Sequence, residues 1–519
     1  MSPTPMVILM KESASEAQYK DLVLSVPDAP NHVEIIYEQV NFRVLVANVN
    51  DCDIRKLWDN PIVETMSREG PYILDDEADD IGPVIGKREA VTTPDEDFRL
   101  VVRDESNATA GLLSGRALDP LIDLRTQANS PWHLKLLSGL SHQVGTALNG
   151  LFYDFPGYLY ADRLTTGPSV SEINIYLLDT GIRASHNDFA GRAVTALDAT
   201  AHPIGLNPGD SSAGGHGTHM CSVSAGNYAG VAKNANIVSV KKNQDVSVLS
   251  RAIGLILRDV VRDEYQGRAV INMSFGAFVQ SLYPNDLPQG APGPQMDIVG
   301  AFLGRLYRAG IVVVCSAGNR GSSAPLNDLT PRLHGGRNTP LIVVGNSRDD
   351  ESRYHGSQCL DPNNDGILTI YANGVDVVSA SNRDDDLYRT ATGTSEATAV
   401  TSGLIAYLIA NDVLQAQLIQ GGLGNFAAAV KAHIIQLGIS MKGIARVDPS
   451  LNTPDNIPRL ANGEAIECLT QNGQVSQALY QLPPEEQQIL PGNFPRILVT
   501  KGLEVLVPQN QLPPCVRRP

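Results

Sequence analysis

The chain has no excess of basic residues, which excludes the usual surface of a nucleic-acid-binding protein. Its 519 residues include 40 lysines and arginines against 56 aspartates and glutamates, a net charge of −16, whereas binding to phosphates requires a basic patch. The chain also has no run of about 18 uncharged apolar residues, so the sequence predicts no membrane-spanning helix. The N-terminus lacks a basic region followed by a cleavable apolar one, and we recognise no signal peptide there.

Cysteine is scarce and dispersed. The six cysteines are Cys52, Cys221, Cys315, Cys359, Cys468 and Cys515. None forms the Cys-x-x-Cys pairs of structural zinc sites. Their spacing does not match a disulfide-dense module either. The sequence allows one or two disulfide bridges, and it therefore does not decide between a reducing and an oxidising compartment.

Residues 6–70 have the pattern of a small α+β unit. Apolar strands and two helices follow one another in the order β-α-β-β-α-β, which is the ferredoxin-like arrangement. We expect the first helix to begin at a capping box formed by Ser13 and Glu16, because a serine followed three residues later by a glutamate satisfies two unpaired backbone amides.

Two other segments show no such pattern. Residues 71–126 are aperiodic and contain the acidic run "DDEADD", so we expect an exposed, flexible linker of the kind that proteases cut. Residues 464–519 form a proline-rich extension, which predicts at most one hairpin, around "RILVTKGLEVLV".

Residues 127–463 carry long apolar runs separated by amphipathic helical stretches. This alternation predicts a doubly wound α/β domain, with a parallel sheet covered on both faces. The runs are "INIYLL", "ANIVSV", "AVINMSF", "GIVVVCS" and "PLIVVG". Because sites in such sheets lie at the carboxyl ends of the strands, the residues that follow the runs are the candidates for function.

Four polar residues have the chemistry of an acyl-transfer site. Asp179 ends the first run and Asn319 follows the fourth, in "SAGN". His216 lies in "GGHGTH", and Ser395 opens the helical stretch "GTSEATAVTSG". An aspartate that orients a histidine, a histidine that deprotonates a serine and an amide that donates to an oxyanion form such a site. Each of the four residues has an alternative interpretation. Asp179 and Asn319 could each belong to a simple turn, and Ser395 could be a helix cap. The base could be His219 in place of His216.

The chain order Asp, His, Ser is that of subtilisin, and longer stretches resemble the subtilisin-like serine proteases (peptidase S8), closest to the proteinase K type of fungi. The matching runs include "YLLDTGIRASHNDFAGRA", "GGHGTHMCSVSAG", "VINMSFG", "VVCSAGN" and "GTSEATAVTSGLIAYL". The stretch "QANSPWHLKLLS" resembles the mature N-terminus of these enzymes. Residues 6–68 resemble their inhibitory propeptide, of the inhibitor I9 type.

The resemblance implies roles for individual residues. Asp179, His216 and Ser395 would be the triad, and Asn319 would lie in the oxyanion hole. The run Ser274-Phe275-Gly276 would be the edge that pairs with the substrate backbone. The resemblance also implies polypeptide substrates, the protein's own propeptide as a partner, and a secreted or vacuolar location. We expect a monomer that needs no cofactor or metal for its chemistry.

The chain departs from the family at several positions near these residues. Glu396 stands where the family has methionine, and Ala399 where it has proline. We expect Glu396 either to disfavour the oxyanion or to point away and complement the positive start of the helix. Cys221 follows "GTHM", and we expect its thiol to be a small buried side chain. The Gly-Ser-Gly stretch that lines the family's substrate cleft is missing, so specificity cannot be inherited.

A structural calcium ion is a further expectation of the resemblance. The run "DPNNDG" at residues 361–366 offers oxygen ligands. Ala372 stands where an EF-hand has its bidentate acid, however, and this favours a solvated turn.

The sequence therefore predicts a serine endopeptidase made as a zymogen, which cleaves peptide bonds through an acyl-enzyme. We expect it to process itself close to residues 125–129. One alternative is a pseudoprotease that binds peptides without cleaving them, and Glu396 is the residue that favours it. The other is an esterase or amidase that uses the same triad.

Overall fold

The computed structural model describes most of the chain. The described residues are 3–26, 33–70, 80–87, 99–103, 121–127, 130–137, 158–161, 170–192, 194–278, 298–348, 352–438, 457–460, 464–468, 496–500 and 503–506.

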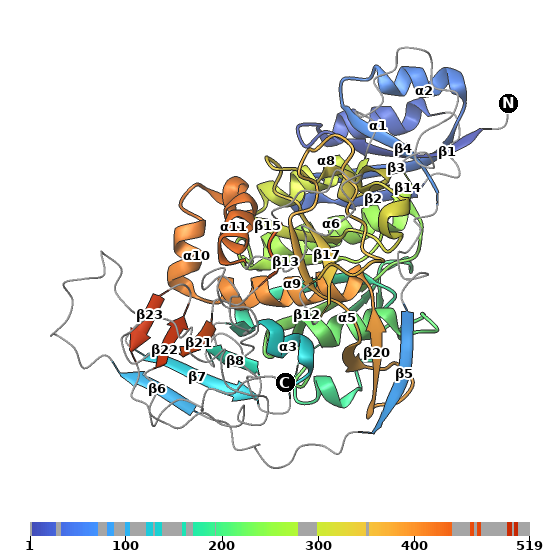
Figure 1. The fold of residues 1–519 in the computed structure, drawn as a ribbon. Helices are drawn as coiled ribbons and strands as arrows, with labels where there is room; N and C mark the ends of the chain where they lie inside the picture. Colours follow the sequence, from blue (N-terminus) through green and yellow to red (C-terminus); the bar gives the residue numbers. More distant parts are fainter. Residues whose placement is uncertain are drawn as a thin grey trace.

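An eight-stranded sheet lies at the centre and confirms the predicted α/β fold (Figure 1). Its strand order is β11-β10-β12-β9-β13-β15-β17-β18. All neighbouring pairs from β10 to β18 are parallel, and β11 is antiparallel to β10. The strands are β9 (Asn174–Asp179), β10 (Val194–Asp198), β11 (Gly205–Leu206), β12 (Asn236–Lys241), β13 (Ala269–Met273), β15 (Ile311–Ser316), β17 (Ile342–Ser347) and β18 (Ile370–Asn373).

Helices pack on both faces of this sheet. One face carries α5 (His216–Ala225) and α9 (Thr394–Ile409), and the other carries α6 (Val246–Arg262) and α8 (Ile298–Arg308). Successive residues of a strand point to opposite faces. Ile175 and Leu177 of β9 accordingly pack with α5 and α9, whereas Tyr176 and Leu178 pack with α6 and α8. This explains why the strands are apolar throughout.

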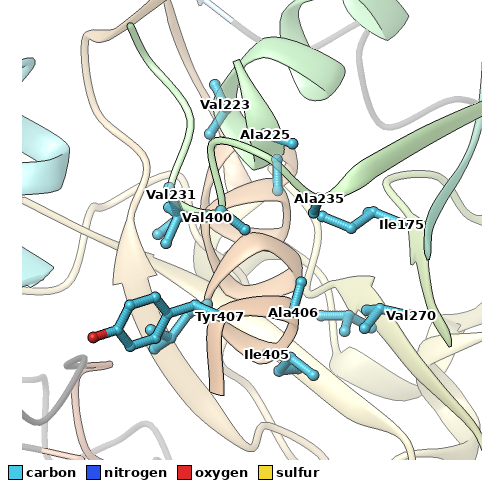
Figure 2. Close-up of a cluster of buried hydrophobic side chains, with 14 of the residues drawn as sticks. Ile175, Val223, Ala225, Val231, Ala235, Val270, Val400, Ile405, Ala406 and Tyr407 are labelled. Carbon is cyan, nitrogen blue, oxygen red and sulfur yellow. The ribbon is translucent and has the colours of Figure 1, made fainter. Parts of the chain in front are cut away.

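Helix α9 is largely apolar, and all its residues are buried, the polar ones included, as expected for a helix at the centre of a large domain. Figure 2 shows Val400, Ile405 and Ala406 of α9 within a cluster that includes Val223 of α5 and Val270 of β13. Because α9 contacts both α5 and the sheet, its first turn is held firmly where the strands end.

The N-terminal unit has the predicted order of elements. It consists of β1 (Thr4–Met10), α1 (Glu16–Ser25), β2 (Val33–Tyr37), β3 (Phe42–Val49), α2 (Asp51–Trp58) and β4 (Val63–Arg68), with a 3-10 turn η2 (Glu38–Val40). The sheet order is β2-β3-β1-β4, and all its pairs are antiparallel. This is the ferredoxin-like arrangement.

The predicted capping box at Ser13 and Glu16 is wrong. Ser15 is the N-cap, and its hydroxyl accepts from the Gln18 amide while the Gln18 side chain accepts from the Ser15 amide. The sequence contains two overlapping Ser-x-x-Glu/Gln pairs. The later one is used because the chain first closes a turn, in which the amide of Ala14 donates to the Lys11 carbonyl.

The N-terminal unit lies against α6 and α8 (Figure 1). Val7 and Leu9 of β1 and Phe42 of β3 share an apolar cluster with these helices. Two groups of polar contacts border this cluster. The buried guanidinium of Arg305 donates to the carbonyl of Met10 and the carboxylate of Glu64. The carboxylate of Glu69 accepts from the amide and hydroxyl of Ser247, at 3.0 and 2.8 Å, in the first turn of α6.

The expectation that residues 71–126 lack regular structure is wrong. They contain β5 (Asp80–Lys87), β6 (Arg99–Arg103) and most of β7 (Leu121–Gln127). β5 pairs with β20 (Leu387–Thr392), which also pairs with β19 (Val377–Ala380). β7 lies between β6 and β8 (Tyr158–Ala161). These strands find their partners far away in the sequence, which local periodicity does not reveal.

The C-terminal extension holds the predicted hairpin and one further strand. β22 (Arg496–Thr500) pairs with β23 (Leu503–Leu506) and with β21 (Glu464–Cys468), all antiparallel. The remaining helices and short strands are α3 (Trp132–Leu137), α10 (Asp412–Leu418), α11 (Leu423–Leu437), β14 (Ala277–Phe278) and β16 (Leu329–Thr330), with the 3-10 turns η4 (Val170–Glu172), η5 (Asn187–Phe189), η7 (Gly321–Ser323), η8 (Leu326–Asp328) and η9 (Arg332–His334).

Two sequence expectations concern the whole chain. Within the described residues, no single helix is long and apolar enough to cross a membrane; α9 and α10 together reach that length, but they are bent by 100° and α9 is wholly buried. Four of the six cysteines are free thiols, Cys52 exposed and Cys221, Cys315 and Cys359 buried. Cys221 is therefore a small buried side chain, as expected.

Candidate active site

Asp179 and His216 form a hydrogen-bonded pair where β9 ends and α5 begins. Asp179 is the last residue of β9, and His216 is the first residue of α5. The His216 Nδ1 lies 2.8 Å from Asp179 Oδ1, and both side chains are buried. An aspartate in this position fixes the imidazole so that Nδ1 carries the proton and Nε2 faces the other way.

The charge of Asp179 is stabilised by its surroundings. Burial alone would raise the pKa of this carboxyl. The charge and hydrogen bond of His216, the hydrogen bond from the Thr180 amide and the charge of Lys242 all lower the pKa. Together they hold the pKa of Asp179 below its ordinary value. Asp179 therefore stays ionised at neutral pH, as an orienting carboxylate must.

Two glycines allow α5 to start so close to β9. Gly215, the N-cap of α5, has φ of +70°, a conformation that side-chain-bearing residues rarely adopt. At Gly217, an added Cβ would lie 2.2 Å from the carbonyl oxygen of Gly181 and 3.1 Å from Asp179 Oδ1. The glycines on either side of His216 therefore place its ring against Asp179.

Ser395 is the second residue of α9 and does not act as its cap. The N-cap is Gly393, and no side chain caps this helix. Ser395 Oγ is buried and makes no hydrogen bond within the described part of the chain. The helix-cap alternative is therefore excluded, and the hydroxyl remains available for chemistry.

Asn319 is held by the residue that precedes Ser395. Its Oδ1 accepts from the amide of Thr394 at 2.8 Å and from the Thr394 hydroxyl at 3.0 Å. Because the amide oxygen is engaged in this way, the Nδ2 donor lies on the opposite side of the group. Sequence reasoning missed Thr394, although its position directly before Ser395 was a usable signal.

The run Ser274-Phe275-Gly276 follows β13, as predicted. The hydroxyl of Ser274 donates to Asn272 Oδ1 at 2.9 Å and contacts the carbonyl of Ser395 at 3.3 Å, which ties the end of β13 to α9. The side chains of Ser274 and Phe275 are buried. Any pairing with a substrate there would therefore use the backbone.

Lys242 is another residue near the site that sequence reasoning missed. It follows β12, its amide donates to the carbonyl of Asp179 at 2.8 Å, and its ammonium lies 3.8 Å from the centre of the Phe275 ring. The position of a lysine directly after an apolar run was the signal for it in the sequence. Lys242 therefore contacts both the backbone of Asp179 and the ring of Phe275 in the candidate substrate edge.

Glu396 does not point away into solvent. Its side chain is completely buried, and Oε1 lies 3.5 Å from Nε2 of His219, which is buried as well. The first turn of α9 is covered on all sides, so no direction from Glu396 leads to water. His219 belongs to this second pair, whereas His216 contacts Asp179, so the geometry favours His216 as the base.

The run at residues 361–366 forms a closed turn. The carboxylate of Asp361 accepts from the amides of Asp365, Gly366 and Ile367 at 3.1, 2.7 and 3.1 Å. This carboxylate is thus occupied by backbone donors from its own loop. Among the described residues, no group of three or more His, Cys, Asp or Glu side chains is placed to hold a metal ion.

A doubly wound sheet that carries Asp, His and Ser, in this chain order, at its carboxyl edge defines the class of subtilisin-like α/β proteins. The chain belongs to the Subtilase family: the profile of that family (Peptidase_S8) matches residues 171–435, just over half of the chain.

Curated relatives include fungal proteases. An alkaline proteinase of Hapsidospora chrysogena is 29% identical over 255 residues, 48% of this chain and 54% of the relative. Alkaline protease 1 of Aspergillus clavatus is 28% identical over 61% of this chain and 65% of the relative. Subtilisin-like protease 2 of Trichophyton rubrum is 30% identical over 55% of this chain and 58% of the relative. The chain thus spans less than two thirds of the length of each.

Among solved structures, the crystal structure of a cold adapted subtilisin-like serine proteinase aligns with a TM-score of 0.39 and 23% identity. The alignment covers 57% of this chain and 89% of that chain.

Proposed function

We propose that the protein is a serine endopeptidase that cleaves polypeptides through an acyl-enzyme on Ser395. The observation that carries the proposal is the buried contact of 2.8 Å between His216 Nδ1 and Asp179 Oδ1 at the carboxyl edge of the sheet. The membership of the chain in the Subtilase family supports it, as do the curated relatives named as proteases.

The chemistry follows from the positions of these groups. Ser395 Oγ attacks the peptide carbonyl, and His216 Nε2 takes the proton of the hydroxyl. Asp179 holds the Nδ1 proton and stabilises the imidazolium that forms. The Asn319 Nδ2 and the backbone amide of Ser395 donate to the oxyanion. His216 then protonates the leaving amine, and water releases the acyl group by the reverse sequence of proton transfers.

The N-terminal unit serves in this proposal as an inhibitory propeptide. Its sheet packs against α6 and α8, and Glu69, which follows β4, contacts the start of α6. The substrate edge and polypeptide substrates belong to the same proposal, as does a monomeric state. A secreted or vacuolar location and a structural calcium ion follow from the family resemblance alone.

A pseudoprotease is the second candidate, and the observation that favours it is the buried carboxyl of Glu396 directly after Ser395. A fluorophosphonate probe separates the two, because it reacts only with an activated serine. We expect the parent to be labelled at Ser395 and to digest denatured casein, and Ser395→Ala to do neither. Absence of labelling in a folded protein from which the N-terminal unit has been removed would establish the pseudoprotease, and ester turnover without casein cleavage would establish an esterase.

A further inference from the structure

A second buried acid–imidazole pair lies beside the candidate triad. Glu396 Oε1 and His219 Nε2 are 3.5 Å apart, and neither side chain has any exposed surface. Neither ring nitrogen of His219 makes a hydrogen bond within the described residues. The contact with Glu396 is a polar interaction that the structure gives this ring.

We expect this pair to contribute little to stability. Burial lowers the pKa of His219 well below its ordinary value, and the nearby charges of Arg389, His216 and His133 lower it further. The imidazole is thus neutral at physiological pH, and the contact is not a full ion pair. Replacing such buried polar pairs by apolar side chains of similar volume is often neutral or stabilising. A role in stability alone does not explain why two polar groups lie here.

The position of the pair suggests its role. Glu396 directly follows Ser395 in the first turn of α9, and His219 lies one turn beyond His216 in α5. The pair thus joins the same two helix starts that carry the candidate nucleophile and base. We propose that Glu396 and His219 are positioning residues that hold the start of α9 against α5 and so set the approach of Ser395 to His216.

This inference rests on the proposed function and makes a specific claim about rates. The substrate edge that follows β13 is held at its own strand end by the contact from Ser274 to Asn272. Loss of the pair should therefore lower kcat and the rate of labelling at Ser395, while KM stays unchanged. A change of approach by even a fraction of an ångström is costly for a reaction that depends on aligned groups.

A double-mutant cycle tests the pair. The variants are Glu396→Leu, His219→Leu and their combination, with Glu396→Gln as the conservative variant that keeps length and polar atoms. Thr401→Val is the matched control, because it removes the buried hydroxyl that donates to Ala397 within the same helix. Each variant is assayed for its Tm, for its rate of fluorophosphonate labelling, and for kcat and KM on a peptide amide.

We expect each leucine variant to be labelled about tenfold more slowly, and the combination to be no slower than the worse single variant, because residues in direct contact act non-additively. The labelling rate of Glu396→Gln should stay within about threefold of that of the parent. Thr401→Val should have a lower Tm but an unchanged labelling rate. Additive losses of labelling rate in the double variant would overturn the positioning role and leave the proposed function standing. A Glu396→Leu variant that is labelled as fast as the parent would do the same. A parent that is folded and has lost its N-terminal unit but is not labelled would overturn the proposed function and this inference together.

Discussion

Asn319 Oδ1 accepts two hydrogen bonds from Thr394, the residue directly before the candidate nucleophile. The strand end of β15 and the start of α9 are therefore locked together through one amide group. The contact also fixes which way the amide faces, since its oxygen is engaged and its nitrogen lies opposite. A donor held in this way is pre-organised for a charge that develops only during the reaction.

The first prediction concerns this donor. Asn319→Ala should lower kcat by about 10²–10³ and leave KM nearly unchanged, because the donor acts mainly in the transition state. Steady-state kinetics on a peptide substrate measures both constants. Asn411→Ala is the control: Asn411 caps α10, so its loss costs about 1 kcal/mol of stability and should leave kcat intact. Near-normal turnover of Asn319→Ala would contradict the prediction and show that "SAGN" is only a turn.

The second prediction concerns Asp179 and acid. The folded protein holds the pKa of this carboxyl below its ordinary value, so its ionised form adds stability above about pH 4, the pKa of an unfolded aspartate. That stability is lost as the pH falls through the lower, folded pKa. The measurement uses Ser395→Ala, which cannot digest itself, with and without Asp179→Asn. Between about pH 7 and about pH 3, the Tm of the protein with Asp179→Asn should therefore fall by less than the Tm of the protein without it.

Asp385→Asn is the matched control for this measurement. Hydrogen bonds from Ser185 and Arg183 lower the pKa of Asp385 as well, but this carboxylate is exposed, and exposed ion pairs contribute little. Its replacement should leave the acid loss of Tm unchanged. Equal losses for Asp179→Asn and its parent would mean that the Asp179–His216 contact does not stabilise the ionised carboxylate.

The sequence predicted the parts of the molecule that periodicity encodes. Strands β9, β12, β13, β15 and β17 were visible as apolar runs, because a parallel sheet buries both faces, and Asp179 and Asn319 were visible because they end such runs. Contacts between distant segments were not visible. Whether Glu396 faced water or His219 depended on the packing of α9 against α5, and the pairing of β5 with β20 joins residues about 300 positions apart.

The third prediction concerns the contact between the N-terminal unit and α8. Arg305 is buried and donates to Glu64 and to the Met10 carbonyl, whereas Arg308 in the same helix forms an exposed pair with Glu12. Truncating one partner of a buried charge pair typically costs 2–5 kcal/mol, roughly, and an exposed pair about 1 kcal/mol or less. We test this in the full-length Ser395→Ala protein. There, the added change Arg305→Met should speed hydrogen exchange of the backbone amides in β1 and β4 more than tenfold, which corresponds to a loss of about 1.4 kcal/mol in the free energy of opening. Arg308→Met should change it little, and equal rates would contradict the prediction.

The last prediction concerns self-processing. A peptide bond must leave its strand partners to enter a protease active site, and Arg125 in β7 pairs with Arg99 of β6 and with Tyr160 of β8. We therefore expect the cut just after β7, at residues 127–129, and not within residues 121–126. The parent should lose its first 130 residues, roughly, while Ser395→Ala stays full length; intact mass before and after incubation measures both. A folded parent that stays full length would show that another enzyme must activate it, and cleavage of Ser395→Ala at the same bond would assign the cut to a contaminant.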